Sequence, residues 1–206
     1  MRRIFLLSLF AIVLCQFASA QEGFIDRWHV GGGLAFPSAP DQFYDYWKQG
    51  YQLFGAVELS GESKFVQVIS FELSYFPFDA GRFLKRSGVD PASTTVSGSK
   101  GIIVSAAYLI KYTFTDYPEF QPAFFAGLGG ASSFRTSATI EYVRYQGTQE
   151  STNSVIPVIP FGATVKLYEG ESNIVEVSLS HTLGLSKKQT TNSNYTSLRL
   201  DLSLAN

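Results

Sequence analysis

Residues 197–204 read Ser197-Leu198-Arg199-Leu200-Asp201-Leu202-Ser203-Leu204, so leucine occupies every second position. The positions between the leucines carry two serines, an arginine and an aspartate. Successive side chains of a β-strand point to opposite faces, so this segment has one wholly apolar face and one polar, charged face. The pattern predicts a β-strand that separates two very different environments.

Seven further segments show the same alternation of apolar with small or polar residues. Each is close to the roughly 9–11 residues that a tilted strand needs to cross a membrane. We therefore predict an all-β fold, an eight-stranded antiparallel up-and-down transmembrane β-barrel. The predicted strands lie near residues 28–36, 51–59, 65–77, 102–114, 122–134, 157–168, 174–184 and 197–205.

The connections between these segments alternate in length. Residues 37–50, 78–101 and 135–156 form long connections, 60–64, 115–121 and 169–173 form short ones, and 185–196 is intermediate. In an outer-membrane barrel with both termini in the periplasm, the odd connections are long outer loops and the even ones are tight turns. The observed order matches this arrangement. The second and third outer loops are rich in Ser, Thr and Gly, and we expect them to extend the barrel hairpins.

The N-terminus has the layout of a secretory signal peptide. Arg2 and Arg3 precede an apolar run over residues 4–13, and the small-residue triplet 18–20 precedes Gln21. A membrane helix is the alternative, but the apolar run falls short of the roughly 20 residues that a helical span needs. We therefore expect residues 1–20 to be removed and residues 21–206 to form the barrel domain.

Composition limits the functions that the mature chain can have. Loss of Arg2 and Arg3 leaves 14 Lys and Arg against 17 Asp and Glu, a formal charge of −3, which does not favour nucleic-acid binding. Cleavage also removes Cys15, the single cysteine, so neither a disulfide nor a thiolate metal site is expected. His29 and His181 are the only histidines, and we predict no metal site and no cofactor.

The polar faces of the strands carry charged residues, whereas the apolar faces are almost free of charge over most strands. Seven ionisable groups cannot form the dry core of a soluble barrel. A soluble lipocalin-like barrel, with the charges outside and a ligand inside, is the alternative. We expect a lumenal network that either plugs the barrel or lines a narrow water path, the plug being favoured because about eight strands enclose little space. Its predicted members are Glu58, Glu72, Lys111, Lys166, Glu176, Arg199 and Asp201.

Aromatic residues gather near the ends of the predicted strands, as in the interfacial girdles of membrane barrels. Near the periplasmic rim we place Phe24, Trp28, Tyr112, Phe114, Tyr117, Phe120 and Tyr168; near the outer rim we place Phe36, Tyr51, Tyr75, Phe76, Phe78 and Phe134.

With this strand pattern, loop alternation and girdle over about residues 24–206, the chain resembles the small eight-stranded outer-membrane barrels of the OmpA/OmpX type, or porin family. The resemblance rests on architecture and not on a diagnostic motif. It implies a bacterial outer-membrane location, contact with membrane lipid and lipopolysaccharide, and insertion by the barrel assembly machinery. We expect a monomer.

The first outer loop contains helix start and stop residues around three aromatic side chains. We predict a short amphipathic helix at roughly 41–49, whose aromatic face covers the barrel rim or rests at the lipid interface. An exposed patch that grips an extracellular partner is the alternative. The candidate residues are Phe43, Tyr46 and Trp47.

Three functions follow from these expectations. The favoured one is a structural or surface-interaction barrel whose outer loops contact partners. The alternative is a narrow pore for small solutes, and a minor alternative is a lipid-modifying enzyme suggested by Ser180 and His181. Because adjacent strand residues point to opposite faces, Ser180 and His181 cannot act together, so we predict no catalytic residues.

Overall fold

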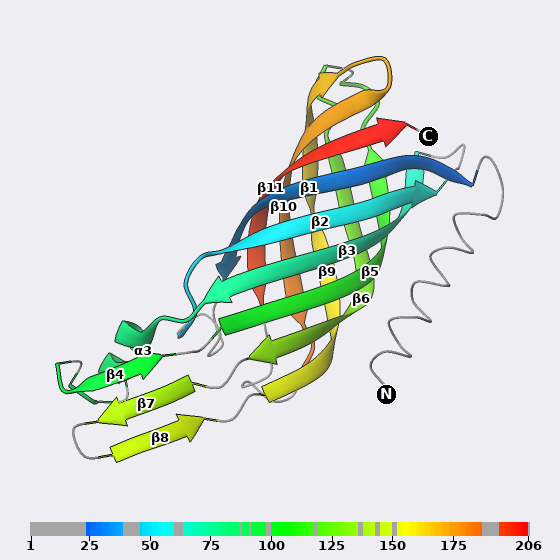
Figure 1. The fold of residues 1–206 in the computed structure, drawn as a ribbon. Helices are drawn as coiled ribbons and strands as arrows, with labels where there is room; N and C mark the ends of the chain where they lie inside the picture. Colours follow the sequence, from blue (N-terminus) through cyan, green and yellow to red (C-terminus); the bar gives the residue numbers. More distant parts are fainter. Residues whose placement is uncertain are drawn as a thin grey trace.

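In a computed structural model of the chain, eight of the described strands close into an antiparallel barrel (Figure 1). Around the barrel the order is β1, β11, β10, β9, β6, β5, β3, β2, and each strand pairs with both neighbours. The fold class predicted from the sequence is confirmed. The barrel strands are β1 (Ile25–Pro37), β2 (Gly50–Leu59), β3 (Phe65–Pro77), β5 (Lys100–Thr113), β6 (Ala123–Arg135), β9 (Thr152–Glu169), β10 (Asn173–Gly184) and β11 (Tyr195–Ala205).

The structure describes residues 24–38, 46–59, 64–86, 88–90, 92–97, 100–117, 119–135, 138–142, 145–149, 152–186 and 194–205. The predicted signal peptide, residues 1–20, lies outside these ranges, as does Phe43. None of the described helices has the length and apolar character needed to cross a membrane.

Closure of the barrel depends on β1, which pairs with β11 on one side and with β2 on the other. In this register His29 lies opposite Ser203 of β11 and opposite Ala56 of β2. A closed sheet leaves no row of unpaired backbone groups, which is the condition for a sheet to stand in hydrocarbon.

Strand β9 is longer than predicted, beginning at Thr152 instead of near residue 157. The predicted strand, 157–168, already contained Pro157 and Pro160, and the missed residues 152–156 were assigned to the third long connection. In the structure the β6–β9 ladder is interrupted beside Pro160, between the pairs Ala126↔Phe161 and Gly129↔Val158, and continues on both sides. The prolines therefore interrupt the β6–β9 ladder locally, and strand β9 continues through them.

Two long connections build structure beyond the barrel (Figure 1). The β3–β5 connection contains α3 (Ala80–Arg86) and β4 (Thr94–Ser97), and the β6–β9 connection contains β7 (Ala138–Tyr142) and β8 (Tyr145–Gln149). The β7–β8 hairpin follows β6 and precedes β9, as expected of an extended hairpin. The prediction missed that β4, from the other loop, pairs with β7 and completes a separate sheet in the order β4, β7, β8.

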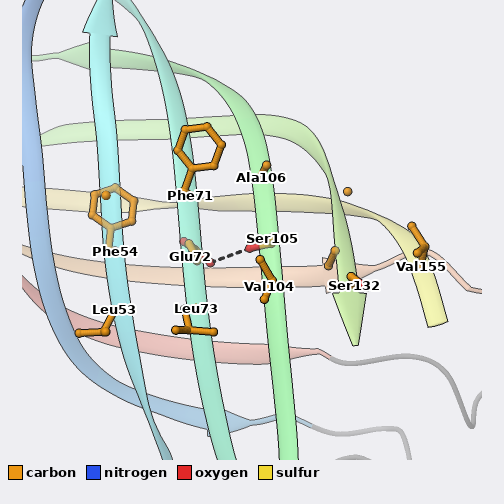
Figure 2. A pocket seen from close by; sticks show the side chains of 13 residues that line it. Leu53, Phe54, Phe71, Glu72, Leu73, Val104, Ser105, Ala106, Ser132 and Val155 are labelled. Carbon is orange, nitrogen blue, oxygen red and sulfur yellow. Dashed lines mark hydrogen bonds between the residues drawn. The ribbon is translucent and has the colours of Figure 1, made fainter. Parts of the chain in front are cut away.

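The two faces of the barrel wall have opposite chemistry. On β11, Leu198 and Leu200 are about half exposed on the outside, whereas Arg199 is 3% exposed on the inside. Figure 2 shows the outer side chains Leu53, Leu73 and Val104 on neighbouring strands. An apolar exterior around a charged interior is the reverse of a soluble barrel and is the arrangement of a barrel surrounded by lipid.

Aromatic side chains line the end of the barrel that carries the short turns. The rings of Phe65, Tyr112, Phe114 and Phe124 form a chain of contacts with centroid distances of 5.0, 4.9 and 5.7 Å. At the loop end Tyr51 is exposed, as predicted for a girdle residue.

The placement of Phe76 in the outer girdle is wrong. Its neighbours on β3 alternate, and Phe76 falls on the inward face, where it is fully buried.

We expect an arginine at the middle of the outer face to destabilise the barrel. Leu200→Arg places a charge in hydrocarbon and should lower the free energy of unfolding by about 2–4 kcal/mol, whereas Leu204→Arg, close to the rim, should cost about 0–1 kcal/mol. Urea unfolding in phosphatidylcholine vesicles measures both values. Equal, small costs for the two variants would mean that the outer face does not meet lipid.

Candidate functional site

All seven ionisable residues predicted for the lumen lie on the inward face of the barrel. Six of them are buried, and Lys111 is partly buried. They do not form one network. The structure divides them into two clusters and one separate ion pair.

The first cluster surrounds Arg199 on β11. Its guanidinium Nη1 lies 2.8 Å from Oε1 of Glu72, and its Nε lies 3.5 Å from Oδ1 of Asp201. Glu72 also accepts hydrogen bonds from the Tyr195 hydroxyl at 2.9 Å and from the Gln52 amide at 3.1 Å. We call these five residues the Arg199 cluster. One cation faces two carboxylates, so every charge in it has an opposite charge beside it.

A ring contact fixes the Arg199 side chain as well. Its guanidinium carbon lies 3.9 Å from the centre of the Phe54 ring, which is close enough for a cation–π interaction. Ser178 donates a short hydrogen bond to the second carboxylate oxygen of Asp201.

The second cluster surrounds Lys111 on β5. The Lys111 ammonium lies 3.0 Å from Glu58 and 3.2 Å from Glu176, so it bridges carboxylates of β2 and β10 across the lumen. The His29 Nε2 atom lies 3.1 Å from the same Glu58 oxygen, and His29 Nδ1 lies 2.6 Å from the Ser203 hydroxyl. We call these five residues the Lys111 cluster.

Lys166 stands apart from both clusters. Its ammonium contacts Glu169, which lies three residues further along β9 and is about half exposed. The pair sits near the short turn between β9 and β10, at the mouth of the lumen and not within it. The sequence analysis grouped Lys166 with the others because strand alternation reports a face and not a depth.

Ser203, His29 and Glu58 lie in a row with the composition that serine hydrolases use. The Ser203 hydroxyl and His29 Nδ1 share a hydrogen bond, and His29 Nε2 lies at ion-pair distance from Glu58. Ser203 is 1% exposed, and the cavity beside His29 and Glu58 has a volume of about 30 Å³. That space suits about one water molecule. The geometry therefore supplies hydrogen bonds that stabilise the lumen, and it leaves no room for an acyl substrate.

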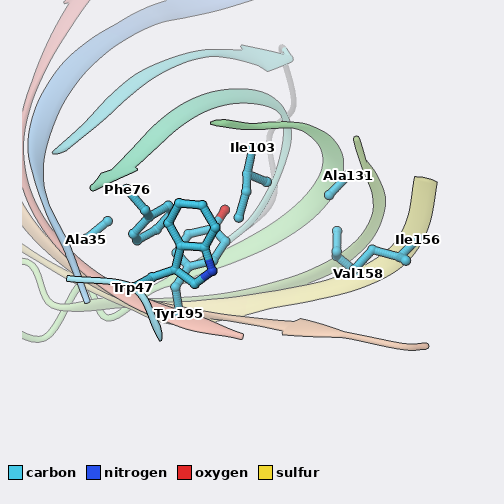
Figure 3. Close-up of a cluster of buried hydrophobic side chains, with 8 residues drawn as sticks. All are labelled: Ala35, Trp47, Phe76, Ile103, Ala131, Ile156, Val158 and Tyr195. Atoms are coloured by element: carbon cyan, nitrogen blue, oxygen red, sulfur yellow. The ribbon is translucent and has the colours of Figure 1, made fainter. Parts of the chain in front are cut away.

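The loop end of the lumen is filled by apolar side chains (Figure 3). Trp47, in the connection between β1 and β2, is 5% exposed and lies inside the barrel mouth beside Phe76 and Tyr195. A side chain at Gly101 would come within 2.7 Å of the Trp47 ring, so the glycine makes room for it. We call this group the aromatic cap. Its buried members are Ala35, Trp47, Phe76, Ile103, Ala131, Ile156, Val158 and Tyr195.

Residues of α3 and β3 hold the aromatic cap from outside. The rings of Trp47 and Phe78 meet edge to face at 5.5 Å, and Tyr46 meets Phe83 of α3 at the same distance. Backbone bonds from Lys48 to Pro77 and from Asp79 to Tyr46 tie the two segments together. Tyr46 and Trp47 were predicted to cover the rim. The structure places Trp47 within the lumen, and most of the predicted helix at 41–49 lies outside the described residues.

The remaining candidates have structural partners. Ser180 points inward to Ser197, and His181 bonds Thr196 on the other face, so adjacent residues do face apart. Within the part of the chain that the structure describes, no group of three His, Cys, Asp or Glu side chains is placed to bind a metal ion.

Sequence reasoning missed the neutral members of the clusters, Gln52, Tyr195 and Ser203, and the role of His29. All four lie at inward positions of their strands. The alternation marked His29, Gln52 and Ser203 as lumenal, whereas Tyr195 lay in the predicted 185–196 connection. Only the register shows which of these residues meet.

No protein-family model matches the chain, and no curated protein matches it. Solved structures do resemble it. A major outer membrane protein from Thermus thermophilus has 12% identical residues and a TM-score of 0.54, with 86% of this chain and 98% of that chain covered. Ail, the attachment invasion locus protein of Yersinia pestis, has 11% identity, a TM-score of 0.46 and coverage of 87% and 97%. Neisserial surface protein A has 11% identity, a TM-score of 0.45 and the same coverage.

The likeness to the Thermus protein carries the argument about the fold, since its TM-score exceeds 0.5. It agrees with the closed barrel, the apolar exterior and the charged lumen. The chain has the fold of an outer-membrane β-barrel.

We expect Glu72→Gln and Arg199→Met each to lower the free energy of unfolding by about 3 kcal/mol. Glu72→Gln leaves Arg199 with only the more distant carboxylate of Asp201, and Arg199→Met leaves Glu72 and Asp201 charged, buried and without a cation. The double variant should cost clearly less than the sum of the single variants, since only one carboxylate of the cluster, Asp201, is then left without a cation, instead of the two left by Arg199→Met alone. Urea unfolding gives the three values. Arg82→Met, which breaks the exposed pair with Asp79, is the control and should cost about 0–1 kcal/mol. Additive costs would show that Arg199 and Glu72 are not coupled.

Proposed function

We propose that this protein is an outer-membrane barrel with a closed lumen, which holds a loop-built sheet outside the cell. The apolar exterior, the aromatic rings at the turn end and the position of the start of β1 beside the end of β11 at the short-turn end support this orientation. In such barrels the short turns face the periplasm and the long loops face outside.

The layered filling of the lumen is the observation that carries the proposal of closure. From the loop end inward come the aromatic cap, the Arg199 cluster and the Lys111 cluster, and Tyr195 belongs to both of the first two. A cavity of about 30 Å³ lies among the charged groups of the two clusters. A conducting path needs a continuous column of water, and the ion pairs and the cap stand in its way.

The sheet of β4, β7 and β8 supports an interaction role for the loops. Among the described strands, β4 and β8 each pair on one side only, so the sheet has two open edges. An open edge can accept a strand from a partner through backbone hydrogen bonds. We propose that an extracellular partner binds here, that the barrel acts as a monomer, and that the barrel assembly machinery inserts it among lipopolysaccharide.

We expect wild-type protein in planar bilayers to give no discrete conductance steps. The triple variant Trp47→Ala, Glu72→Ser, Arg199→Ser removes the central ion pair of the Arg199 cluster and opens the aromatic cap. It should give reproducible conductance steps. Glu58, Glu176 and Asp201 then outnumber Lys111, so the current should favour cations. Trp28→Ala, which removes the outward-facing tryptophan, is the control and should stay silent. Discrete wild-type channels would replace closure with the pore function.

The proposed orientation predicts which segments antibodies reach on intact cells. An epitope inserted between Tyr142 and Tyr145, at the tip of the β7–β8 hairpin, should be labelled at the cell surface. The same epitope inserted between Glu171 and Ser172, in the β9–β10 turn, should be labelled only after the outer membrane is opened. Labelling in the opposite order would reverse the barrel in the membrane.

A further inference from the structure

The loop-built sheet of β4, β7 and β8 has an unprotected edge at β8. Strand β4 contacts helix α3, whereas β8 pairs only with β7 among the described strands. Natural edge strands are usually protected against pairing with other chains by lysine, proline or a bulge. Strand β8 reads Tyr145-Gln146-Gly147-Thr148-Gln149, without charge or proline, and its register with β7 is unbroken. This edge is therefore open to a further strand.

The β7–β8 register decides which backbone groups of β8 face the open edge. Tyr142 pairs with Tyr145 across a loop of two residues, and the residues that flank such a loop bond each other. Because antiparallel partners bond in alternation, every second residue from Tyr145 onwards directs its N–H and C=O groups towards β7. The N–H and C=O groups of Gln146 and Thr148 therefore point away from β7, towards the open edge.

A second copy of β8 matches this edge. If it runs antiparallel and is related by a two-fold axis at Gly147, Gln146 of each copy lies opposite Thr148 of the other. Both of these pairs can then exchange two backbone hydrogen bonds. Between them the two copies of Gly147 form a pair without hydrogen bonds, in which Cα atoms approach to about 4.5 Å, and glycine has no side chain to clash there. A contact of this symmetry closes after two copies.

The charges around β8 suit the same axis. Arg144 and Glu150, which lie outside the described residues, stand three positions before and three positions after Gly147 in the sequence. The sequence read against its own reverse about Gly147 therefore sets arginine against glutamate, and not like charges against each other. This complementarity of the sequence to itself favours a second copy over an unrelated strand.

The direction of β8 places the second copy in another membrane. Strand β7 leads away from the barrel, and β8 returns towards it (Figure 1). Copies in one membrane have the same orientation, so their β8 strands run in the same direction and cannot pair antiparallel. An antiparallel copy has its barrel on the far side of the contact. Its membrane therefore faces the first membrane.

The width of the barrel excludes pairing of β8 with β4 of a neighbour in the same membrane. These two strands run in the same direction, since each is antiparallel to β7. A copy joined in this way would be shifted by the width of three strands, about 14 Å. The backbone of a barrel of eight tilted strands is already about 16 Å across without its side chains. The two barrels would overlap.

We propose that β8 pairs antiparallel with β8 of a second copy of this protein in a facing membrane, with the two-fold axis at Gly147, so that the sheet joins two cells. The proposal rests on the proposed outward position of the loop-built sheet and names its partner. Within one membrane the barrel remains a monomer. A single contact is small, so stable joining of two membranes depends on many copies acting together.

The test is clustering of vesicles that contain the full chain, folded into preformed vesicles so that the hydrophilic loop end stays outside. One population carries a donor dye and another an acceptor dye, and energy transfer between them measures contact of their membranes. We expect energy transfer when both populations contain the protein, and none when one population is free of protein. Clustering with protein-free vesicles would assign the contact to lipid and overturn the proposal, as would the absence of clustering in both mixtures.

Charge exchange at the axis identifies the contact. Gly147→Lys should reduce clustering at least tenfold, because the axis sets two lysines directly opposite each other, and Gly147→Glu should do the same with two carboxylates. Mixing the Gly147→Lys population with the Gly147→Glu population should restore clustering, since opposite charges then meet between the two membranes. Unchanged clustering of either variant alone, or no recovery in the mixture, would overturn the two-fold contact.

Proline separates the two edges of the sheet. Thr148→Pro removes an N–H that faces the open edge of β8 and should abolish clustering. Val96→Pro is the matched control, because the alternation across β7 directs the Val96 N–H to the opposite edge, and clustering should persist. Loss of clustering by Val96→Pro, or its persistence in Thr148→Pro, would overturn the assignment to β8.

Failure of this proposal is distinguishable from failure of the proposed function. Wild-type conductance and epitope labelling report on closure and orientation without a second membrane. Vesicles that stay dispersed, while the epitope is still labelled at the cell surface, would remove the second copy as the partner and leave the outward position of the sheet standing.

Discussion

The pairing of β1 with β11 is the constraint on which the rest of the structure depends. In hydrocarbon every backbone N–H and C=O needs a partner within the protein, and only a closed ladder supplies one for every strand. Closure fixes the register of all eight barrel strands together. The register then decides which inward side chains meet, and therefore sets both the ion pairs of the lumen and the chemistry of the outer wall.

The barrel could be predicted from the sequence because its determinants are local. Alternation along Leu198 to Leu204 is visible in one strand, and the strand lengths and loop order need only neighbouring segments. The limits of the method appear at β9 and at Phe76. Residues 152–156 begin β9 but were assigned to the third long connection, and Phe76, placed in the outer girdle, lies on the inward face of β3.

The pairings inside the lumen could not be predicted, because they join residues that are distant in the chain. Glu72 and Arg199 are 127 positions apart, and His29 and Ser203 are 174 apart. Strand alternation places such residues on the same face but gives neither their depth nor their neighbours. The same reason explains why the pairing of β4 with β7, which joins two different loops, was missed.

The long separation between His29 and Ser203 has a consequence for how the barrel forms. Contacts between distant segments form late, because the chain must lose conformational entropy to bring the segments together before the contact contributes any favourable free energy. The partners of Arg199 come from β2, β3 and β11, on the two sides of the closing seam. The charged side chains of the lumen therefore stay hydrated until β1 pairs with β11. The final closing step of folding is also the step that excludes water from the lumen.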